Sequence, residues 1–214
     1  MKLNSDGILD ERRAGILLHI TSLPGGNSYH GRLDKEAYYF VDFLKNTGIS
    51  VWQTLPLGMP HADGSPYQCL SAHAGNSNLI NIDWLVEKDW LEIPEICADT
   101  RCDPEFRTNC LIAEAYSGFQ HSAGEIDVND FALFCQEKAG WLNDYALFLA
   151  LRNEFDNTPW NEWPAQFKNR QPAALKEARH RLIQFIETVK FEQYIFFRQW
   201  KDLRNYAHEQ GVYL

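Results

Sequence analysis

Residues 15–57 read GILLHITSLPGGNSYHGRLDKEAYYFVDFLKNTGISVWQTLPL, in which two short apolar runs flank a segment of helical periodicity. The first run, residues 15–23, is partly β-branched and ends at the turn signal Pro24-Gly25-Gly26. Such a run predicts a strand that is buried on both faces. The second run, residues 49–57, is also rich in β-forming residues and is closed by Gly58. It predicts a second strand.

The segment between the two runs predicts an amphipathic helix. Asp34 can cap its N-terminus, and Gly48 supplies a stop at its end. Its apolar side chains recur at the i, i+3, i+4, i+7 spacing of one helical face, at Ala37, Phe40, Val41 and Leu44. A strand, a helix and a strand in this order imply two parallel strands joined by a right-handed crossover.

Two loops of this unit form the expected functional face. Ligands of parallel α/β sheets and barrels bind beyond the carboxyl ends of the strands. The loops after Ser22 and after Leu57 follow those ends, and both are rich in turn residues.

The rest of the chain reads mainly as helices. Residues 83–187 are too long for a simple crossover and predict an inserted helical subdomain. One helix around Asn143 carries a clear apolar stripe and a shorter stripe precedes Gly140, and both are interpreted as core faces. The side chains of the two stripes are Trp141, Leu142, Tyr145, Phe148 and Leu149, and Phe131, Phe134 and Cys135.

The last helix is predicted from about Lys190, with Gly211 as its C-cap. Four apolar side chains share one face of this helix, namely Phe196, Trp200, Leu203 and Ala207. The apolar triplet at residues 212–214 reads as the beginning of a third parallel strand, so the chain is expected to end inside an element.

Composition and charge exclude several classes of function. The net charge of -9 disfavours nucleic-acid binding, which needs clustered Lys and Arg. Residues 1–7 lack the apolar segment of a leader, and no apolar run is long enough to span a bilayer. The protein is therefore expected to be soluble and cytoplasmic, with no membrane partner.

Cysteine and glycine spacing predicts neither a metal nor a cofactor. The five cysteines, Cys69, Cys97, Cys102, Cys110 and Cys135, lack the paired CxxC spacing of a structural zinc site, which favours reduced thiols. Gly25-Gly26 lacks the later glycines and the Lys of a phosphate-binding loop.

Five segments in a fixed order carry a family resemblance. They are residues 15–24 (GILLHITSLP), 36–44 (EAYYFVDFL), 52–58 (WQTLPLG), 65–68 (SPYQ) and 71–76 (SAHAGN). Together they resemble the amylomaltases, the 4-alpha-glucanotransferases of glycoside hydrolase family 77, also called disproportionating enzymes. The match is dense over residues 13–83, and it continues more sparsely over nearly the whole chain.

The resemblance implies an α/β fold, an incomplete TIM (β/α)8 barrel of the first two to three strands with an inserted, mainly helical subdomain. Residues 1–82 would begin the catalytic barrel, residues 83–187 would form the insertion, and residues 188–214 would supply a barrel helix and the start of the next strand.

The resemblance also implies a reaction, the retaining transfer of alpha-1,4-glucan segments between maltodextrins. One carboxylate attacks the anomeric carbon, and a protonated Glu assists departure of the leaving sugar. The three catalytic carboxylates of the family lie on later barrel strands, and none has a counterpart among residues 1–214. No catalytic residue is therefore assigned, and this chain alone is expected to be inactive.

Ser65 and Tyr67 match the substrate-contacting positions of the family in the Ser-Pro-Tyr-Gln loop. The Tyr67 ring could stack on a glucose face, and Pro66 biases Ser65 toward an extended conformation. Without the resemblance, Tyr67 reads as a packing residue in a turn.

Gln68, Asn76 and Ser22 are weaker substrate-binding candidates. Amides suit sugar hydroxyls but are equally common as loop-stabilising groups. Ser22 lies on the expected functional face, although a Ser beside a Pro-Gly turn more often forms the turn.

At three other places a structural interpretation is favoured over a functional one. His19 reads as a hydrogen-bonded core residue rather than a catalytic base or metal ligand. Asp63-Gly64 reads as a turn pair rather than a carboxylate beside substrate. Trp160 and Trp163 have flanking prolines and read as packed, rigid loops rather than a sugar-stacking pair.

The sequence departs from the family pattern in places and leaves three functional hypotheses open. Residues 31–34 replace a more usual glycine-and-aspartate turn, His73 stands where Phe is common, and Ser77 stands where Pro is common. The chain could be the N-terminal portion of a glucanotransferase, a noncatalytic relative that binds alpha-glucans through Tyr67, or a nonfunctional remnant with exposed strand edges.

Overall fold

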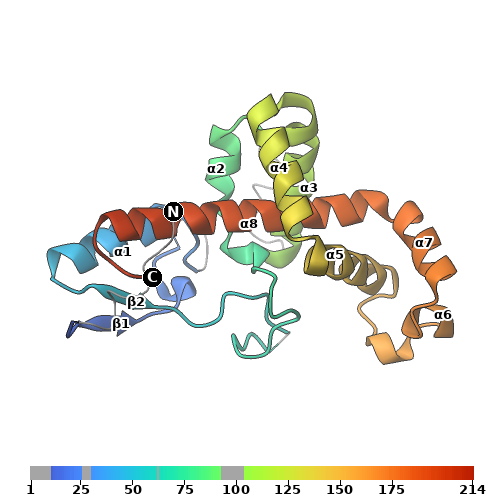
Figure 1. Cartoon of the computed structure of the whole chain (residues 1–214), viewed down its shortest axis with the longest axis horizontal. Helices are drawn as coiled ribbons and strands as arrows, with labels where there is room; N and C mark the ends of the chain where they lie inside the picture. Colours follow the sequence, from blue (N-terminus) through green and yellow to red (C-terminus); the bar gives the residue numbers. More distant parts are fainter. Residues whose placement is uncertain (1–10, 26–29, 62, 93–103) are drawn as a thin grey trace. The chain divides into compact units, whose positions relative to one another are not determined.

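The computed structural model describes residues 11–25, 30–61, 63–92 and 104–214. The chain divides into two compact units, which are described separately (Figure 1). The first unit comprises Met1–Leu70, Gly75–Asn81 and Phe196–Leu214, and the second comprises Ser71–Ala74 and Ile82–Ile195.

The first unit is built on a parallel strand-helix-strand arrangement. Strands β1 (Gly15–Leu17) and β2 (Val51–Gln53) pair in parallel, with Ile16 opposite Trp52, and helix α1 (Lys35–Asn46) connects them. The predicted parallel pair joined through a helix is confirmed.

Helix α1 begins and ends where local chemistry requires. The Asp34 carboxylate accepts a hydrogen bond from the Glu36 backbone N–H at 3.0 Å, and the chain leaves the helix through Gly48 at φ 73°. A positive φ costs glycine little, which explains the stop at that position. The predicted inner face is buried at Ala37, Val41 and Leu44.

Near the end of the described chain, Tyr213 forms a parallel bridge with β2. Trp52 N–H donates to the Tyr213 carbonyl at 2.8 Å, and Tyr213 N–H donates to the Ser50 carbonyl at 2.9 Å, in parallel register. Gly211 has φ 79°, and Val212 N–H closes the helix end on the Ala207 carbonyl. The parallel neighbours therefore follow chain order, and the start of a third strand stays a prediction that this single parallel bridge favours.

The prediction of one long buried strand over residues 15–23 is wrong. The ladder stops after Leu18 N–H bonds to the Gln53 carbonyl, and Leu17 is 57% exposed. The chain then turns into the 3₁₀ helix η2 (Ile20–Ser22), in which Ile20 is fully buried. An apolar run can bury its side chains by turning as well as by extending, and periodicity does not separate the two.

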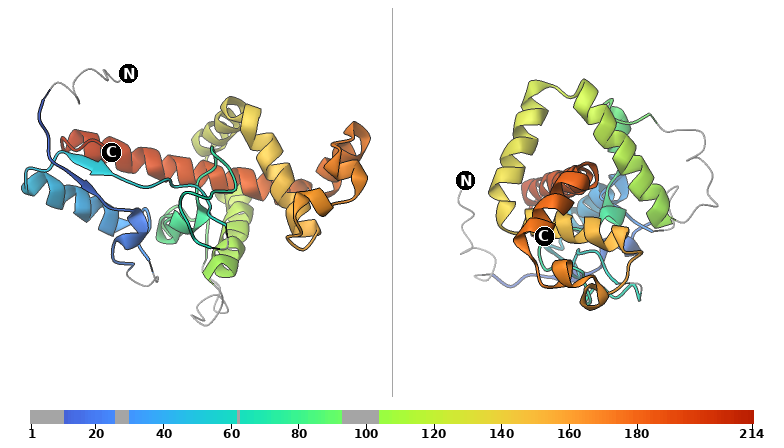
Figure 2. Two further views of the ribbon diagram at one scale, coloured as in Figure 1. Left: turned by 90° about the horizontal axis from the view of Figure 1, so that it is seen from below. Right: turned by 90° about the vertical axis from the view of Figure 1, so that its right-hand side faces the viewer.

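The end of helix α8 (Ile183–Glu209) covers α1 within the first unit. The Tyr38 and Tyr206 rings lie 5.1 Å apart, and the Tyr206 hydroxyl donates to Asp42 Oδ1 at 2.6 Å. The ribbons in Figure 1 and in the left view of Figure 2 show the end of α8 alongside α1. Helix α8 begins before the predicted Lys190, because residues 182–190 contain no Gly or Pro and the Ile186 N–H already bonds to the Leu182 carbonyl.

The second unit is helical throughout its regular described elements, as predicted. Besides the first part of α8, its elements are α2 (Ile82–Glu87), α3 (Pro104–Ser122), α4 (Glu125–Glu137), α5 (Ala139–Glu154), the 3₁₀ helix η5 (Trp160–Glu162), α6 (Ala165–Lys168) and α7 (Pro172–Arg181). Among the helices that the structure describes, none is both long and apolar enough to cross a membrane.

Helix α5 supplies the centre of one core of the second unit. Leu142 is fully buried and Tyr145 nearly so, and burial raises the pKa of the Tyr145 phenol. Apolar side chains of α5, α7 and α8 form this core together with Trp163. A second group of rings surrounds Phe191 and comprises Trp90, Tyr116, Phe119, Phe131 and Tyr194. The core interpretation is confirmed for the α5 stripe, whereas Phe131 and Phe134 of the shorter stripe pack against these rings but are only half-buried.

The described cysteines are free thiols. Cys69, Cys110 and Cys135 are each half-buried, and burial raises the pKa of Cys135 to about 11. A thiol with a raised pKa is a poor nucleophile at neutral pH. Cys97 and Cys102 lie outside the described residues.

Candidate functional site

The loop after β2 forms a short hairpin that presents the predicted site residues. Its two arms pair at Pro60 and Cys69 in an antiparallel bridge. Leu70 N–H bonds to the Met59 carbonyl and His61 N–H to the Gln68 carbonyl, each at 3.0 Å. Residues 63–67 thereby form a defined tip between the arms.

The tip is shaped by Asp63 and Gly64. Asp63 Oδ1 accepts a hydrogen bond from Ser65 N–H at 3.2 Å, and Gly64 has φ 69°. Gln68 N–H bonds back to the Ser65 carbonyl at 3.1 Å, which closes a second turn. The interpretation of Asp63-Gly64 as a turn pair is confirmed, since this carboxylate orders the backbone of the tip.

The three predicted binding residues of the hairpin differ in exposure. Tyr67 is 74% exposed, Gln68 is exposed, and Ser65 is half-buried. An exposed phenol on a hydrogen-bonded hairpin offers a ring face together with a hydroxyl. The alternative interpretation of Tyr67 as a packing residue does not fit its exposure.

Asn76 lies in residues 75–81, the returning arm of the loop that follows the hairpin, and it has a capping role. Its side-chain oxygen accepts a hydrogen bond from Asn78 N–H at 3.0 Å and caps the 3₁₀ helix η3 (Ser77–Leu79). Its backbone N–H bonds to the Leu57 carbonyl at 2.8 Å, which ties this arm to the start of the loop. A contact between Asn76 and substrate stays a prediction.

Ser22 lies on the other predicted loop. It ends η2, is exposed, and donates its backbone N–H to the His19 carbonyl at 2.9 Å. The turn-forming alternative for Ser22 accounts for these contacts, and its role toward substrate stays a prediction.

His19 connects the two loops of the first unit. Its Nδ1 accepts a hydrogen bond from Thr21 N–H at 3.4 Å, while burial lowers the pKa of the ring and a hydrogen bond to the Pro56 backbone raises it. Proline has no N–H, so the Pro56 carbonyl is the acceptor and the ring is its donor. His19 is hydrogen-bonded as predicted, but its ring is only half-buried, so the prediction of a core position is wrong.

The two tryptophans near residue 160 have different environments. Trp163 is 7% exposed, and its Nε1–H donates to the Thr158 carbonyl at 2.8 Å. Trp160 is 57% exposed. The packing interpretation is confirmed for Trp163 and wrong for Trp160. The turn buries the Trp163 ring and leaves the Trp160 ring exposed to solvent.

No cluster of three His, Cys, Asp or Glu suited to a metal ion occurs among the residues that the structure describes. The chemistry offered by the hairpin is that of polar recognition, with a phenol, an amide and a hydroxyl. Asp63 is the only carboxylate in residues 59–70, and a retaining glycosyl transfer needs two carboxyl groups roughly 5 Å apart.

Comparison with known proteins decides the family. The model of the 4-alpha-glucanotransferase family, glycoside hydrolase 77, matches residues 18–214. The chain belongs to this family. It is 38% identical over 213 residues to the 4-alpha-glucanotransferase of Thermus thermophilus, which covers 94% of this chain and 41% of that relative. It is 36% identical over 214 residues to the enzyme of the same name from Streptococcus pneumoniae, covering 95% and 42%.

A solved structure supports the same family fold. The amylomaltase from Streptococcus agalactiae, in complex with acarbose, superposes with a TM-score of 0.84 at 34% identity and covers 94% of this chain and 42% of that chain. The chain thus spans about two-fifths of the length of the relatives it matches.

Helix α8 contacts residues 75–81, which follow the hairpin, through Gln199 and Phe196. The sequence interpretation had not assigned this role to either residue. The buried Gln199 side chain exchanges two hydrogen bonds with the Asn81 backbone, at 2.8 and 3.0 Å. Gly75 lies directly against the Phe196 ring. A Gln within an apolar helical face is the sequence signal that could have indicated the contact between Gln199 and Asn81.

Replacing Ser77 by Pro is expected to stabilise the protein. Its hydroxyl is buried, and among the described residues it has no hydrogen-bond partner. Ser77 is the first residue of η3, where Pro sacrifices no helical bond, and Asn76 has the extended backbone that precedes Pro (φ -82°, ψ 114°). Ser77→Pro should raise the free energy of unfolding by about 1 kcal/mol in urea denaturation.

Ser77→Ala is the matched control for this stabilisation. It removes the buried hydroxyl without restricting the backbone, so it should give part of the gain. A lower denaturation midpoint for both variants would show that the hydroxyl has a partner and that the argument is wrong.

Proposed function

We propose that the protein to which this chain belongs is a 4-alpha-glucanotransferase that transfers alpha-1,4-glucan segments between maltodextrins. The observation that carries the proposal is the family membership over residues 18–214, together with a hairpin whose tip exposes Tyr67 beside Ser65 and Gln68. The amylomaltase of similar structure was solved with acarbose, so a glucan-like ligand suits the family.

We further infer that the first unit is the beginning of a (β/α)8 barrel. Its three parallel segments are hydrogen-bonded in chain order, from β1 to β2 to residues 212–214, as consecutive barrel strands are. Both η2 and the hairpin follow the carboxyl ends of their strands, where barrel enzymes bind substrate. On this proposal residues 82–195 interrupt the unit between the second strand and α8.

In this proposal the hairpin residues bind sugar and leave the bond chemistry to other parts of the enzyme. Tyr67 stacks on a glucose ring, Ser65 and Gln68 bond to hydroxyls, and Asn76 holds the arm behind them. The catalytic carboxylates are placed outside residues 1–214, as the family resemblance implies, and the single carboxylate of the hairpin accepts the Ser65 N–H.

Titration calorimetry with maltoheptaose tests the binding role of the hairpin. Tyr67→Ala should weaken binding about tenfold, the factor that corresponds to ~1.4 kcal/mol, and Tyr67→Phe should retain the stacking part. Tyr39, which is 61% exposed on α1, provides a matched control, and Tyr39→Ala should leave binding unchanged. Equal affinities for the wild-type chain and Tyr67→Ala would remove Tyr67 from the site.

An activity assay tests where the chemistry resides. The 214-residue chain incubated with maltotriose should release no glucose and form no longer oligomers. Turnover by this chain would contradict the placement of the carboxylates outside it, while leaving the glucanotransferase assignment intact.

A further inference from the structure

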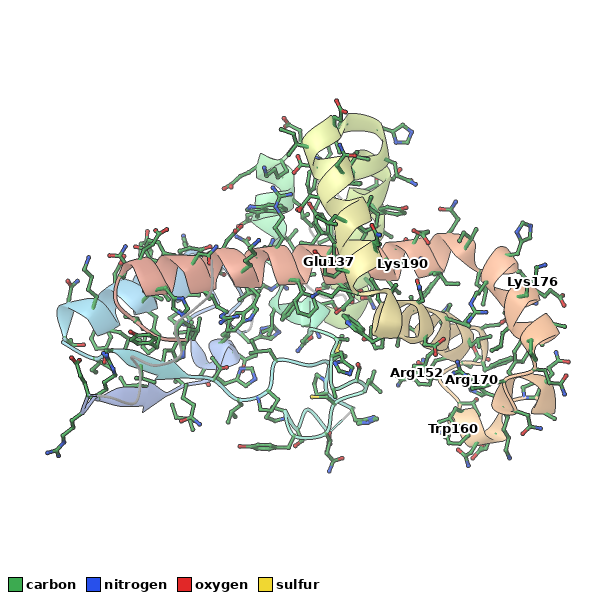
Figure 3. All side chains as sticks on the ribbon, in the orientation of Figure 1. Glu137, Arg152, Trp160, Arg170, Lys176 and Lys190 are labelled. Carbon is green, nitrogen blue, oxygen red and sulfur yellow. The ribbon has the colours of Figure 1, made fainter. Side chains whose placement is uncertain are left out.

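A rigid turn of the second unit presents a tryptophan to solvent. Trp163 anchors this turn, because its ring lies 5.6 Å from Phe148 and 5.5 Å from Phe155 and its indole N–H bonds to the Thr158 carbonyl. Trp160, three residues earlier, is 57% exposed. Figure 3 shows Trp160 in the connection between α5 and α6.

The turn holds its shape through prolines and backbone hydrogen bonds. Pro159 precedes η5 and accepts Glu162 N–H at 2.9 Å, and Pro164 precedes α6 and accepts Phe167 N–H at 2.9 Å. Proline fixes φ on both sides of the exposed ring. Little backbone freedom remains to be lost when a ligand arrives, which favours binding.

The neighbours of Trp160 on the turn are polar. Asn161 and Glu162 are both exposed, and an amide and a carboxylate can bond sugar hydroxyls. Trp160 is the only large apolar side chain among residues 139–182 that the structure describes as strongly exposed. A protein partner would need a wider apolar patch, whereas one flat ring with polar neighbours matches the C–H face and hydroxyl rim of a single sugar.

We propose that Trp160, Asn161 and Glu162 form a glucan-binding site on the second unit, built from different residues than the hairpin tip. The choice of an alpha-1,4-glucan as ligand rests on the proposed function. The Trp160 ring stacks on one glucose unit, and the two polar side chains bond its hydroxyls. A branched polymer such as glycogen offers many chain ends, so a second contact strengthens its retention by raising the effective concentration.

Affinity electrophoresis in glycogen-containing gels, with all 214 residues present, tests this site. Trp160→Ala should raise the apparent Kd for glycogen about tenfold, and Trp160→Phe should give an intermediate value. Tyr39→Ala is the control for loss of an exposed ring. The near-UV circular dichroism signal of the remaining aromatic residues should stay unchanged in Trp160→Ala, which would show that the weaker glycogen binding does not come from unfolding.

A second measurement uses the wild-type chain alone. N-bromosuccinimide oxidises exposed indoles, and peptide mass spectrometry locates the oxidised residue. Maltoheptaose should slow oxidation at Trp160 several-fold, while cellohexaose, a beta-1,4-linked chain of different curvature, should protect less.

The outcomes separate this inference from the proposed function. The Trp160 site is overturned if Trp160→Ala is retained by glycogen as strongly as the wild type and maltoheptaose does not protect Trp160 from oxidation. If retention is lost in Tyr67→Ala at the same time, the hairpin proposal still stands. Loss in Trp160→Ala alone supports the site and removes the binding role of the hairpin. A wild-type chain that neither migrates more slowly in glycogen nor shows protection overturns both.

Discussion

Gly75→Ala is expected to lower the free energy of unfolding by about 3 kcal/mol, at the upper end of ordinary overpacking penalties. A Cβ atom at this position would lie 2.0 Å from Phe196 Cδ1 and 2.2 Å from Phe196 Cε1. Real atoms cannot approach so closely, so the loop or the ring must move. Phe196 is 3% exposed on a long helix and has little room to yield.

Chemical denaturation of Gly75→Ala measures this loss, and two further variants isolate its cause. Gly140→Ala is the matched control, because a Cβ there meets nothing within 4 Å and a helical Ala should stabilise by about 0.5–1 kcal/mol. Phe196→Leu added to Gly75→Ala should recover part of the loss by making space. A purely additive double variant would show that contact with the ring is not the reason for glycine.

Local chemical signals were sufficient to predict the limits of α1 and the end of α8. Asp34 and Gly48 bracket α1, and Gly211 ends α8, because a carboxylate cap and a positive φ act within a few residues of chain. The parallel pairing also followed, since two short apolar runs separated by a helix have few other arrangements. These features depend on neighbours in sequence.

Features that depend on distant residues were not predictable in the same way. Residues 15–23 are apolar throughout, and only the short pairing with β2 determines that the strand ends and η2 begins. Trp160 and Trp163 share a proline-rich context, so sequence alone could not tell which ring the core accepts. The core of the second unit is built by residues from α5, α7 and α8, and that assembly selects Trp163.

The candidate site shows the same division. Tyr67 and Ser65 were predicted through the family resemblance, and the hairpin places them together at an ordered tip. Asn76 was predicted as a substrate ligand with loop stabilisation as the alternative, and its side-chain oxygen is engaged in the loop. Gln199 was missed because its partner is the backbone of Asn81, more than a hundred residues earlier.

Gln199→Leu is expected to lower the free energy of unfolding by about 2–3 kcal/mol, because it removes both hydrogen bonds that the Gln199 side chain makes to the half-buried Asn81 backbone. Leucine has a similar volume, so the loss reports hydrogen bonding more than packing. Urea denaturation at neutral pH measures it. A loss below about 0.5 kcal/mol would mean that water replaces both bonds.

Gln199→Glu provides a sharper version of the same experiment. An ionised carboxylate can accept from Asn81 N–H but cannot donate to the Asn81 carbonyl, so this variant should be destabilised at neutral pH. The introduced carboxyl is buried beside a carbonyl oxygen, which raises its folded-state pKa above the unfolded value of about 4.3. Its stabilising contribution is therefore fully present below that unfolded pKa and is lost as pH rises through the folded pKa.

The free energy of unfolding of Gln199→Glu should consequently approach the wild-type value on acidification, because the protonated carboxyl again offers a donor and an acceptor. The difference in unfolding free energy between wild type and a variant is the deficit of that variant. Gln199→Leu cannot titrate, so its deficit should stay nearly constant over the same pH range. A constant deficit in both variants would show that packing alone explains the burial of Gln199. A deficit that shrinks only for Gln199→Glu would establish that hydrogen bonding from α8 holds the returning arm of the loop behind the hairpin.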